Sequence, residues 1–82
     1  MTSSKGQRTR RAETVTVLVN GRERQLVGGA TVAELLADYG LGATVRGIAV
    51  AIDGEVVPRS QWAQQQLRGG EHVEIVRAVQ GG

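Results

Sequence analysis

The chain has 82 residues and a formal net charge of +2, a size that allows one small domain. It contains no cysteine, which excludes disulfides, zinc–cysteinate sites, iron–sulfur clusters and a catalytic thiol of its own. Because there is no Phe, one Trp and one Tyr, Val, Ile, Leu and Ala must fill the core, which favours a β-rich fold.

The positive charge is concentrated in residues 1–13, where one Lys and three Arg oppose one Glu. This is +3 and leaves −1 for the remainder. The segment is polar, so we expect a disordered basic leader. The rest lacks the basic face and aromatic rings of a nucleic-acid binder, so no nucleic-acid partner is expected. No apolar run has membrane-spanning length and no signal peptide is recognisable, so we expect no membrane contact and a cytoplasmic location.

The first elements read as a β-hairpin. Over residues 14–19 valines alternate with other residues, which is the period of a strand with one buried face. Asn20-Gly21 then accepts the positive φ angles of a type I′ turn, and residues 24–27 form the return strand.

A helix follows the Gly28-Gly29 break. Thr31 and Glu34 have the spacing of a capping box, and Gly40 is placed to end the helix. Helical spacing places four apolar residues on one stripe: Val32, Leu35, Leu36 and Tyr39.

A second hairpin is expected from residues 47–52, Asp53-Gly54 and 55–57. Residues 59–67 then predict a short helical turn or ordered loop that lays Trp62 against the domain. The last strand spans about 71–79.

The order hairpin, helix, hairpin, loop, strand describes an α+β protein with a ubiquitin-like β-grasp. We expect a mixed sheet of four to five strands packed on one helix, with the first and last strands parallel at its centre. The domain would span 14–79, followed by a flexible tail over 80–82. The expected helix-facing residues are Val15, Val17, Val19, Leu35, Leu36, Ile48, Val50, Ile52, Val57, Val73 and Ile75.

A search for catalytic groups finds none. The single histidine, His72, has no cysteine or acidic cluster beside it, and there is no phosphate-binding P-loop motif. We therefore expect that the chain is not an enzyme and binds no metal.

Leu18, Val56 and Val76 are apolar but have the wrong parity for the core, so they fall on the sheet face away from the helix. They predict a partner-docking surface, although isolated surface aliphatics are also common.

The sequence ends in Gly81-Gly82 after a predicted strand. Glycine has no Cβ, so such an end can thread a narrow channel into another protein. A frayed terminus is the alternative interpretation of the dipeptide.

From about Val15 to Gly82 the chain resembles the ThiS family of sulfur carriers in thiamine thiazole biosynthesis. The resemblance is carried by the segments 17–20, 31–36, 49–63 and 70–79 together with the Gly-Gly end. Its most discriminating piece is Val57-Pro-Arg-x-x-Trp62.

The resemblance implies that an E1-like adenylating enzyme (ThiF type) activates Gly82 with ATP and magnesium. A sulfur donor protein then supplies the sulfur, leaving a thiocarboxylate. Thiazole synthase (ThiG type) then accepts that sulfur, with the tail inserted into its active site. Gly81 is the narrow residue before Gly82 in that inserted tail. The carrier itself would be a monomer with no bound cofactor.

Three alternatives stay open at this point. The carrier could serve cysteine or molybdopterin synthesis. Gly82 could instead form an isopeptide bond with a target lysine, as in a ubiquitin-like modifier. The chain could also be a plain β-grasp interaction module.

Overall fold

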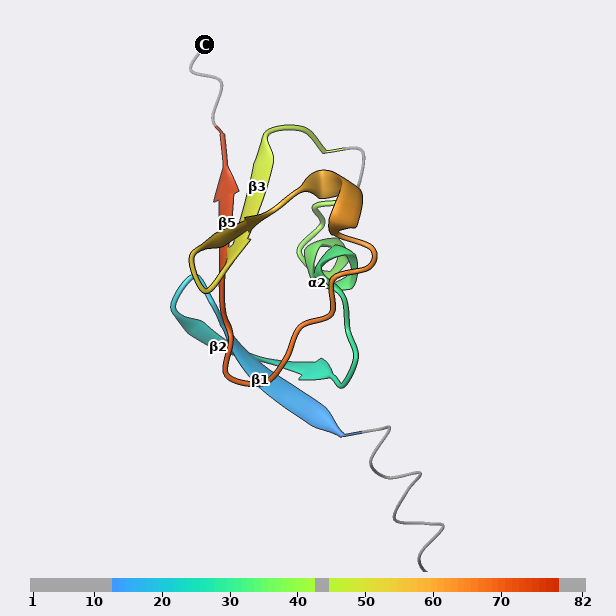
Figure 1. Ribbon diagram of the computed structural model, residues 1–82, viewed down its shortest axis with the longest axis vertical. Coiled ribbons are helices and arrows are strands. Elements are labelled where there is room, and N and C mark those ends of the chain that lie inside the picture. The colour runs from blue at the N-terminus through green and yellow to red at the C-terminus, as the bar shows by residue number, and fades with distance from the viewer. Residues whose placement is uncertain (1–12, 43–44, 79–82) are drawn as a thin grey trace, which may run out of the picture.

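The computed structural model describes residues 13–42 and 45–78. Within them one five-stranded mixed sheet packs against one α-helix (Figure 1). The elements are β1 (Thr14–Val19), β2 (Arg22–Val27), α2 (Val32–Asp38), β3 (Ile48–Ile52), β4 (Glu55–Val57), the 3₁₀ turn η1 (Arg59–Gln61) and β5 (His72–Arg77). The strand order is β2-β1-β5-β3-β4, and β1 and β5 pair in parallel. The predicted β-grasp order and its parallel central pair are confirmed.

Both hairpin turns form where the dipeptides predict them. Asn20 and Gly21 have φ angles of 52° and 84°, and Asp53 and Gly54 have 49° and 88°. Strand β2 begins at Arg22, two residues before the predicted start, because the two-residue turn pairs Val19 with Arg22 directly.

Helix α2 begins with the predicted capping box. The Glu34 main-chain N–H donates to the Thr31 Oγ1 at 3.2 Å, and the Thr31 N–H donates to the Glu34 Oε1 at 2.9 Å. Two orphan donors of the first turn are thereby satisfied.

The helix ends one residue before Tyr39, the last residue of the apolar stripe. Helical residues stop at Asp38, and Tyr39 is the C-cap with 42% of its surface exposed. Gly40 follows with a φ of 75°, as predicted. The tyrosine ring lies beneath the Arg24 guanidinium, 4.9 Å from its carbon, rather than in the core.

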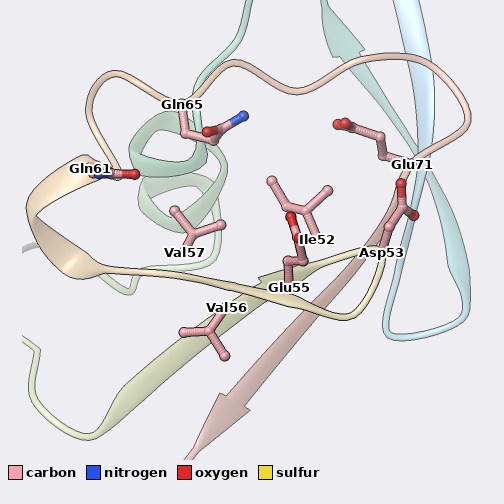
Figure 2. Close-up of a pocket in the computed structure, with 8 residues that line it drawn as sticks. All are labelled: Ile52, Asp53, Glu55, Val56, Val57, Gln61, Gln65 and Glu71. Carbon is pink, nitrogen blue, oxygen red and sulfur yellow. The ribbon is translucent and has the colours of Figure 1, made fainter.

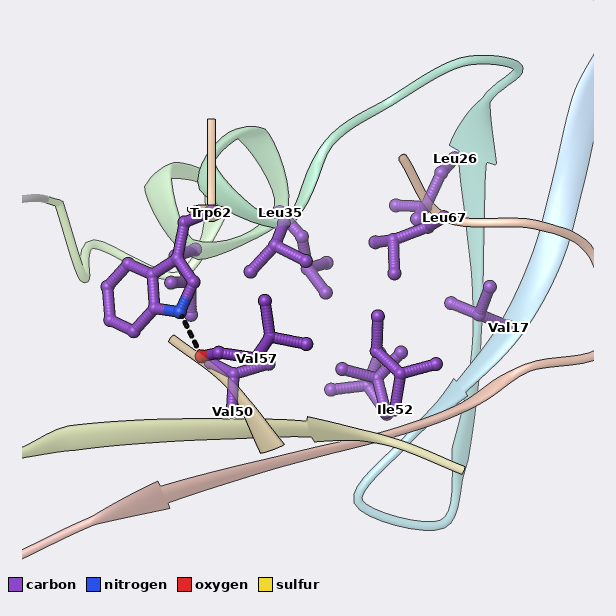
Figure 3. Packing of buried hydrophobic residues seen from close by; sticks show 12 residues of the cluster. Val17, Leu26, Leu35, Val50, Ile52, Val57, Trp62 and Leu67 are labelled. Carbon is purple, nitrogen blue, oxygen red and sulfur yellow. Dashed lines mark hydrogen bonds between the residues drawn. The ribbon is translucent and has the colours of Figure 1, made fainter. Parts of the chain in front are cut away.

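The core lies between the sheet and α2 (Figure 3). Eight of the predicted residues are buried there, and Val15, Ile48 and Ile75 are partly buried at its margin. The pattern did not place Leu26 and Leu67 in the core. Leu26 stands in a polar strand and Leu67 in an irregular segment, so neither had a periodic signal.

The segment from η1 to Leu67 completes the helix start. Val32 N–H donates to the Gln65 carbonyl at 2.9 Å, and Ala33 N–H donates to the Trp62 carbonyl at 3.0 Å. Leu67 N–H donates to the Ala30 carbonyl at 2.8 Å. The predicted ordered loop is therefore part of the domain, because it pairs helix donors that would otherwise lack partners.

Candidate functional site

The site of interest is the end of the sheet toward which β5 runs (Figure 1). Its last described main-chain bond joins the Ala78 N–H to the Gly47 carbonyl at 2.7 Å. Gly47 has a φ of 76°, and a Cβ there would stand 3.4 Å from the Ala78 Cβ. A glycine thus lets the main chain close against β5 just before the tail. The predicted tail residues Gly81 and Gly82 lie outside the described residues.

Strand β5 is held by one residue from each hairpin turn. The Asn20 Oδ1 accepts from the Ile75 N–H at 2.8 Å, and the Asp53 Oδ1 accepts from the His72 N–H at 2.9 Å. The sequence marked Asn20 and Asp53 only as turn residues. The available sequence signal was a residue with a side-chain oxygen acceptor at the first turn position of each hairpin. This signal does not show which main-chain N–H the acceptor binds.

The predicted docking residues occupy the face of the sheet away from α2. Val56 and Val76 are 74% and 59% exposed, and Leu18 is half-buried. Figure 2 shows Val56 pointing away from the side of β4 on which Val57 lies. Only Ala51, on β3, stands between Val56 and β5.

These three residues do not form one cluster. Leu18 and Val76 line the same hollow, about 500 Å³ in volume, on the outer face. Val56 lines a different pocket beyond β3. Leu18 and Val76 therefore line one hollow at different points along β5, since Leu18 pairs with His72, and Val56 lies outside that hollow.

The Val57-Pro-Arg-x-x-Trp62 motif is structural. Trp62 is buried, and its Nε1–H donates to the Val57 carbonyl at 3.0 Å (Figure 3). The Arg59 guanidinium carbon lies 4.5 Å from the centre of the Trp62 ring, and its Nη2 donates to the Val45 carbonyl at 2.8 Å. The motif thus fixes the segment after β4 against the core, as the packing interpretation of Trp62 predicted.

Among the described residues, every ionisable side chain is exposed except those of Arg24 and Glu71, which are partly buried. In the pocket of Figure 2, Asp53 and Glu71 accept from the main-chain N–H groups of His72 and Arg68. His72 itself is exposed. Across residues 13–42 and 45–78 no group of three His, Cys, Asp or Glu residues is placed to hold a metal ion. In the same residues no helix has the length and apolarity to cross a membrane.

Comparison with known families decides the classification. The model of the ThiS family matches residues 17–82, which includes all of β5 and the Gly-Gly end. The chain belongs to the ThiS family. The predicted resemblance is confirmed, and the match covers the described domain except for the first residues of β1.

Relatives of this ThiS-family chain agree. The sulfur carrier protein ThiS of Escherichia coli K12 is 36% identical over 66 residues, which cover 80% of this chain and 97% of the relative. The crystal structure of the thiamine biosynthesis protein ThiS from Geobacter metallireducens aligns with a TM-score of 0.68 and 26% identity. It covers 83% of this chain and all of that one. SAMP1 from Haloferax volcanii, with 18% identity and a TM-score of 0.54, shares the fold.

A thiazole synthase contains a similar region. The enzyme of Paramagnetospirillum magneticum is 38% identical over 66 residues, which are 80% of this chain and 20% of that protein. In that enzyme the carrier-like region is therefore one part of a larger chain.

Proposed function

We propose that this ThiS-family protein carries sulfur for the thiazole ring of thiamine as a thiocarboxylate on Gly82. The observation that carries the proposal is the family match, which runs through the domain to the last residue. The direction of β5, which leads the main chain toward one end of the sheet, supports it (Figure 1).

The chemistry requires prior activation of Gly82. A carboxylate is a poor electrophile, because its charge is delocalised and oxide is a poor leaving group. In the proposed first step a Gly82 carboxylate oxygen attacks the α-phosphorus of ATP and pyrophosphate leaves. A persulfide sulfur then displaces AMP from the acyl carbon. A thiol cleaves the resulting acyl disulfide, which leaves the thiocarboxylate on Gly82 and a disulfide on the donor side.

The carrier supplies position rather than catalysis in this scheme. Its domain holds β5 by the main-chain contacts with Asn20 and Asp53 and the final bond to Gly47. In this proposal the adenylating partner, a ThiF-type enzyme, binds the ATP and magnesium. The proposed location of the carrier is the cytoplasm.

The proposed acceptor of the sulfur is a ThiG-type thiazole synthase. Support comes from the thiazole synthase of Paramagnetospirillum magneticum, which holds a region similar to this chain within its own sequence. Two activities that work on the same intermediate gain from such linkage, because it raises their effective concentration.

The decisive experiment measures the intact mass of the chain after incubation with a ThiF-type enzyme, ATP, magnesium and a persulfide donor. A gain equal to the mass difference between sulfur and oxygen is expected, followed by its loss when thiazole synthase and its substrates are added. Deletion of Gly81-Gly82 should abolish the gain and leave the melting temperature unchanged. As a matched control, deletion of residues 1–12 should leave the gain intact.

Other outcomes identify the alternatives. A mass equal to the sum of this chain and a target protein would show conjugation. A loaded chain that thiazole synthase cannot unload would place the carrier in another thiocarboxylate pathway. No mass change in any mixture would leave a plain interaction module.

A further inference from the structure

The side chain of Asn20 takes the place of a strand next to β5. Its Oδ1 accepts from the Ile75 N–H at 2.8 Å, and its Nδ2 donates to the Ile75 carbonyl at 3.2 Å. Its own main-chain N–H donates to the Val73 carbonyl at 2.9 Å. A carboxamide offers one donor and one acceptor in the arrangement of a peptide group. Asn20 therefore continues the β1 side of the ladder by one position after β1 has turned away.

The next main-chain position on that side belongs to Arg77. The Asp53 N–H donates to the His72 carbonyl, and the Ala78 N–H donates to the Gly47 carbonyl. The main-chain N–H and C=O groups of even-numbered β5 residues therefore point toward β3. The main-chain groups of odd-numbered β5 residues point toward β1. Strand β1 pairs with β5 only at Leu18 and Val19. Among the described residues nothing hydrogen-bonds to the Arg77 N–H or carbonyl on this side. Strand β5 is thus a central strand up to Ile75 and an open edge at Arg77.

The reach of the tail brings a partner to this edge. Four residues follow Ala78, and fully extended they span about 13 Å. A protein that reacts with the Gly82 carboxyl group must therefore bring its own surface close to the end of β5. An open strand edge offers such a surface main-chain donors and acceptors at fixed spacing.

We propose that thiazole synthase adds an extended segment of its own main chain alongside β5 at Arg77, and that Asn20 marks where this added strand begins. The proposal rests on the carrier function above. The outer-face hollow lined by Leu18, Asn20 and Val76 adjoins the same edge. Alternate side chains of the added strand point toward this hollow, because successive side chains of a strand alternate between its faces.

Arg77 offers a matched pair of variants. Arg77→Pro removes the N–H that faces the open edge and keeps the bonds of Val76 and Ala78 to β3, and proline is tolerated at strand edges. Arg77→Ala removes the charged side chain and keeps the N–H. We expect Arg77→Pro to weaken the complex with thiazole synthase at least about tenfold, and Arg77→Ala to change affinity by less than about threefold. Equal effects of the two variants would overturn the proposal.

Hydrogen exchange on the unaltered chain tests the same contact without relying on the folding of a proline variant. In the free protein the Arg77 amide should exchange faster than that of Ala78, and thiazole synthase should slow it at least about tenfold. A complex that forms and leaves the Arg77 amide unprotected refutes the added strand while the carrier function stands. If the unaltered chain forms no complex with thiazole synthase, both proposals are wrong.

Discussion

Asn20 and Asp53 occupy the same position in their two hairpins, and each closes onto β5. Both are the first residue of a two-residue turn, both have a positive φ, and both precede glycine. Each also uses its main-chain N–H and a side-chain oxygen on β5. The strand that leads to the tail is therefore fixed from both sides by turns that are 33 residues apart in sequence.

Replacing either turn residue by glycine removes its side-chain contact with β5 and keeps the turn. Glycine keeps the positive φ at no steric cost, so the hairpin should form in both variants. Asn20→Gly should accelerate amide exchange at Ile75, and Asp53→Gly should accelerate it at His72, each by about fivefold or more, since each variant removes that amide's acceptor. Each variant is the control for the other. Equal acceleration at both amides would show general loosening instead of two separate contacts.

Trp62 should contribute to stability through its N–H as well as its burial. Trp62→Phe keeps an aromatic ring, removes the indole N–H that donates to the Val57 carbonyl and leaves part of the buried indole volume unfilled. We expect the free energy of unfolding to fall by about 1–3 kcal/mol. Tyr39→Phe, at an exposed ring, should change it by less than about 0.5 kcal/mol. Urea unfolding measures both, and an unchanged midpoint for Trp62→Phe would mean that the indole hydrogen bond adds nothing.

Gly47 should be more sensitive to substitution than Gly42. Gly47→Ala forces a residue with a Cβ into a φ of 76° and sets that Cβ 3.4 Å from the Ala78 Cβ. The expected loss of stability is about 1–2 kcal/mol, with faster exchange at the Ala78 amide. Gly42 has open space around its would-be Cβ and no positive φ, so Gly42→Ala should change stability by less than about 1 kcal/mol. Matching losses at the two sites would contradict the proposed close approach.

The outer face gives a prediction about partner binding. Val76→Asp places a carboxylate in the hollow shared with Leu18 and should weaken thiazole synthase binding at least about tenfold. Val56→Asp should have a smaller effect, because Val56 lies outside that hollow. Titration of each variant against thiazole synthase measures the order.

Val27→Asp is the matched control for this face. Val27 is 62% exposed and pairs with Thr14, at the end of the sheet remote from the end of β5. All three valines are exposed, so the three variants should unfold at similar urea concentrations. A loss of affinity as large for Val27→Asp as for Val76→Asp would argue against a docking face near the tail.

Local signals in the sequence were sufficient for most elements. The capping box of Thr31 and Glu34 and the two positive-φ dipeptides act over a few residues, so their consequences can be deduced without knowing the rest of the molecule. Period-2 alternation likewise identified most of the sheet's core face. The apolar periodicity of the helix extends one residue beyond its end, to the exposed C-cap Tyr39.

Contacts between distant segments were decided only by the tertiary structure. Nothing near Asn20 indicates that its carboxamide meets Ile75, 55 residues later, because that meeting depends on where β1 stops along β5. Leu67 is buried for a similar reason, since its irregular segment is bonded to Ala30 beside the helix. By itself the sequence determined the elements, the family and the glycine end. The fold alone decided that β5 loses its partner strand just before the tail, because strand register is a property of two segments and not of either one.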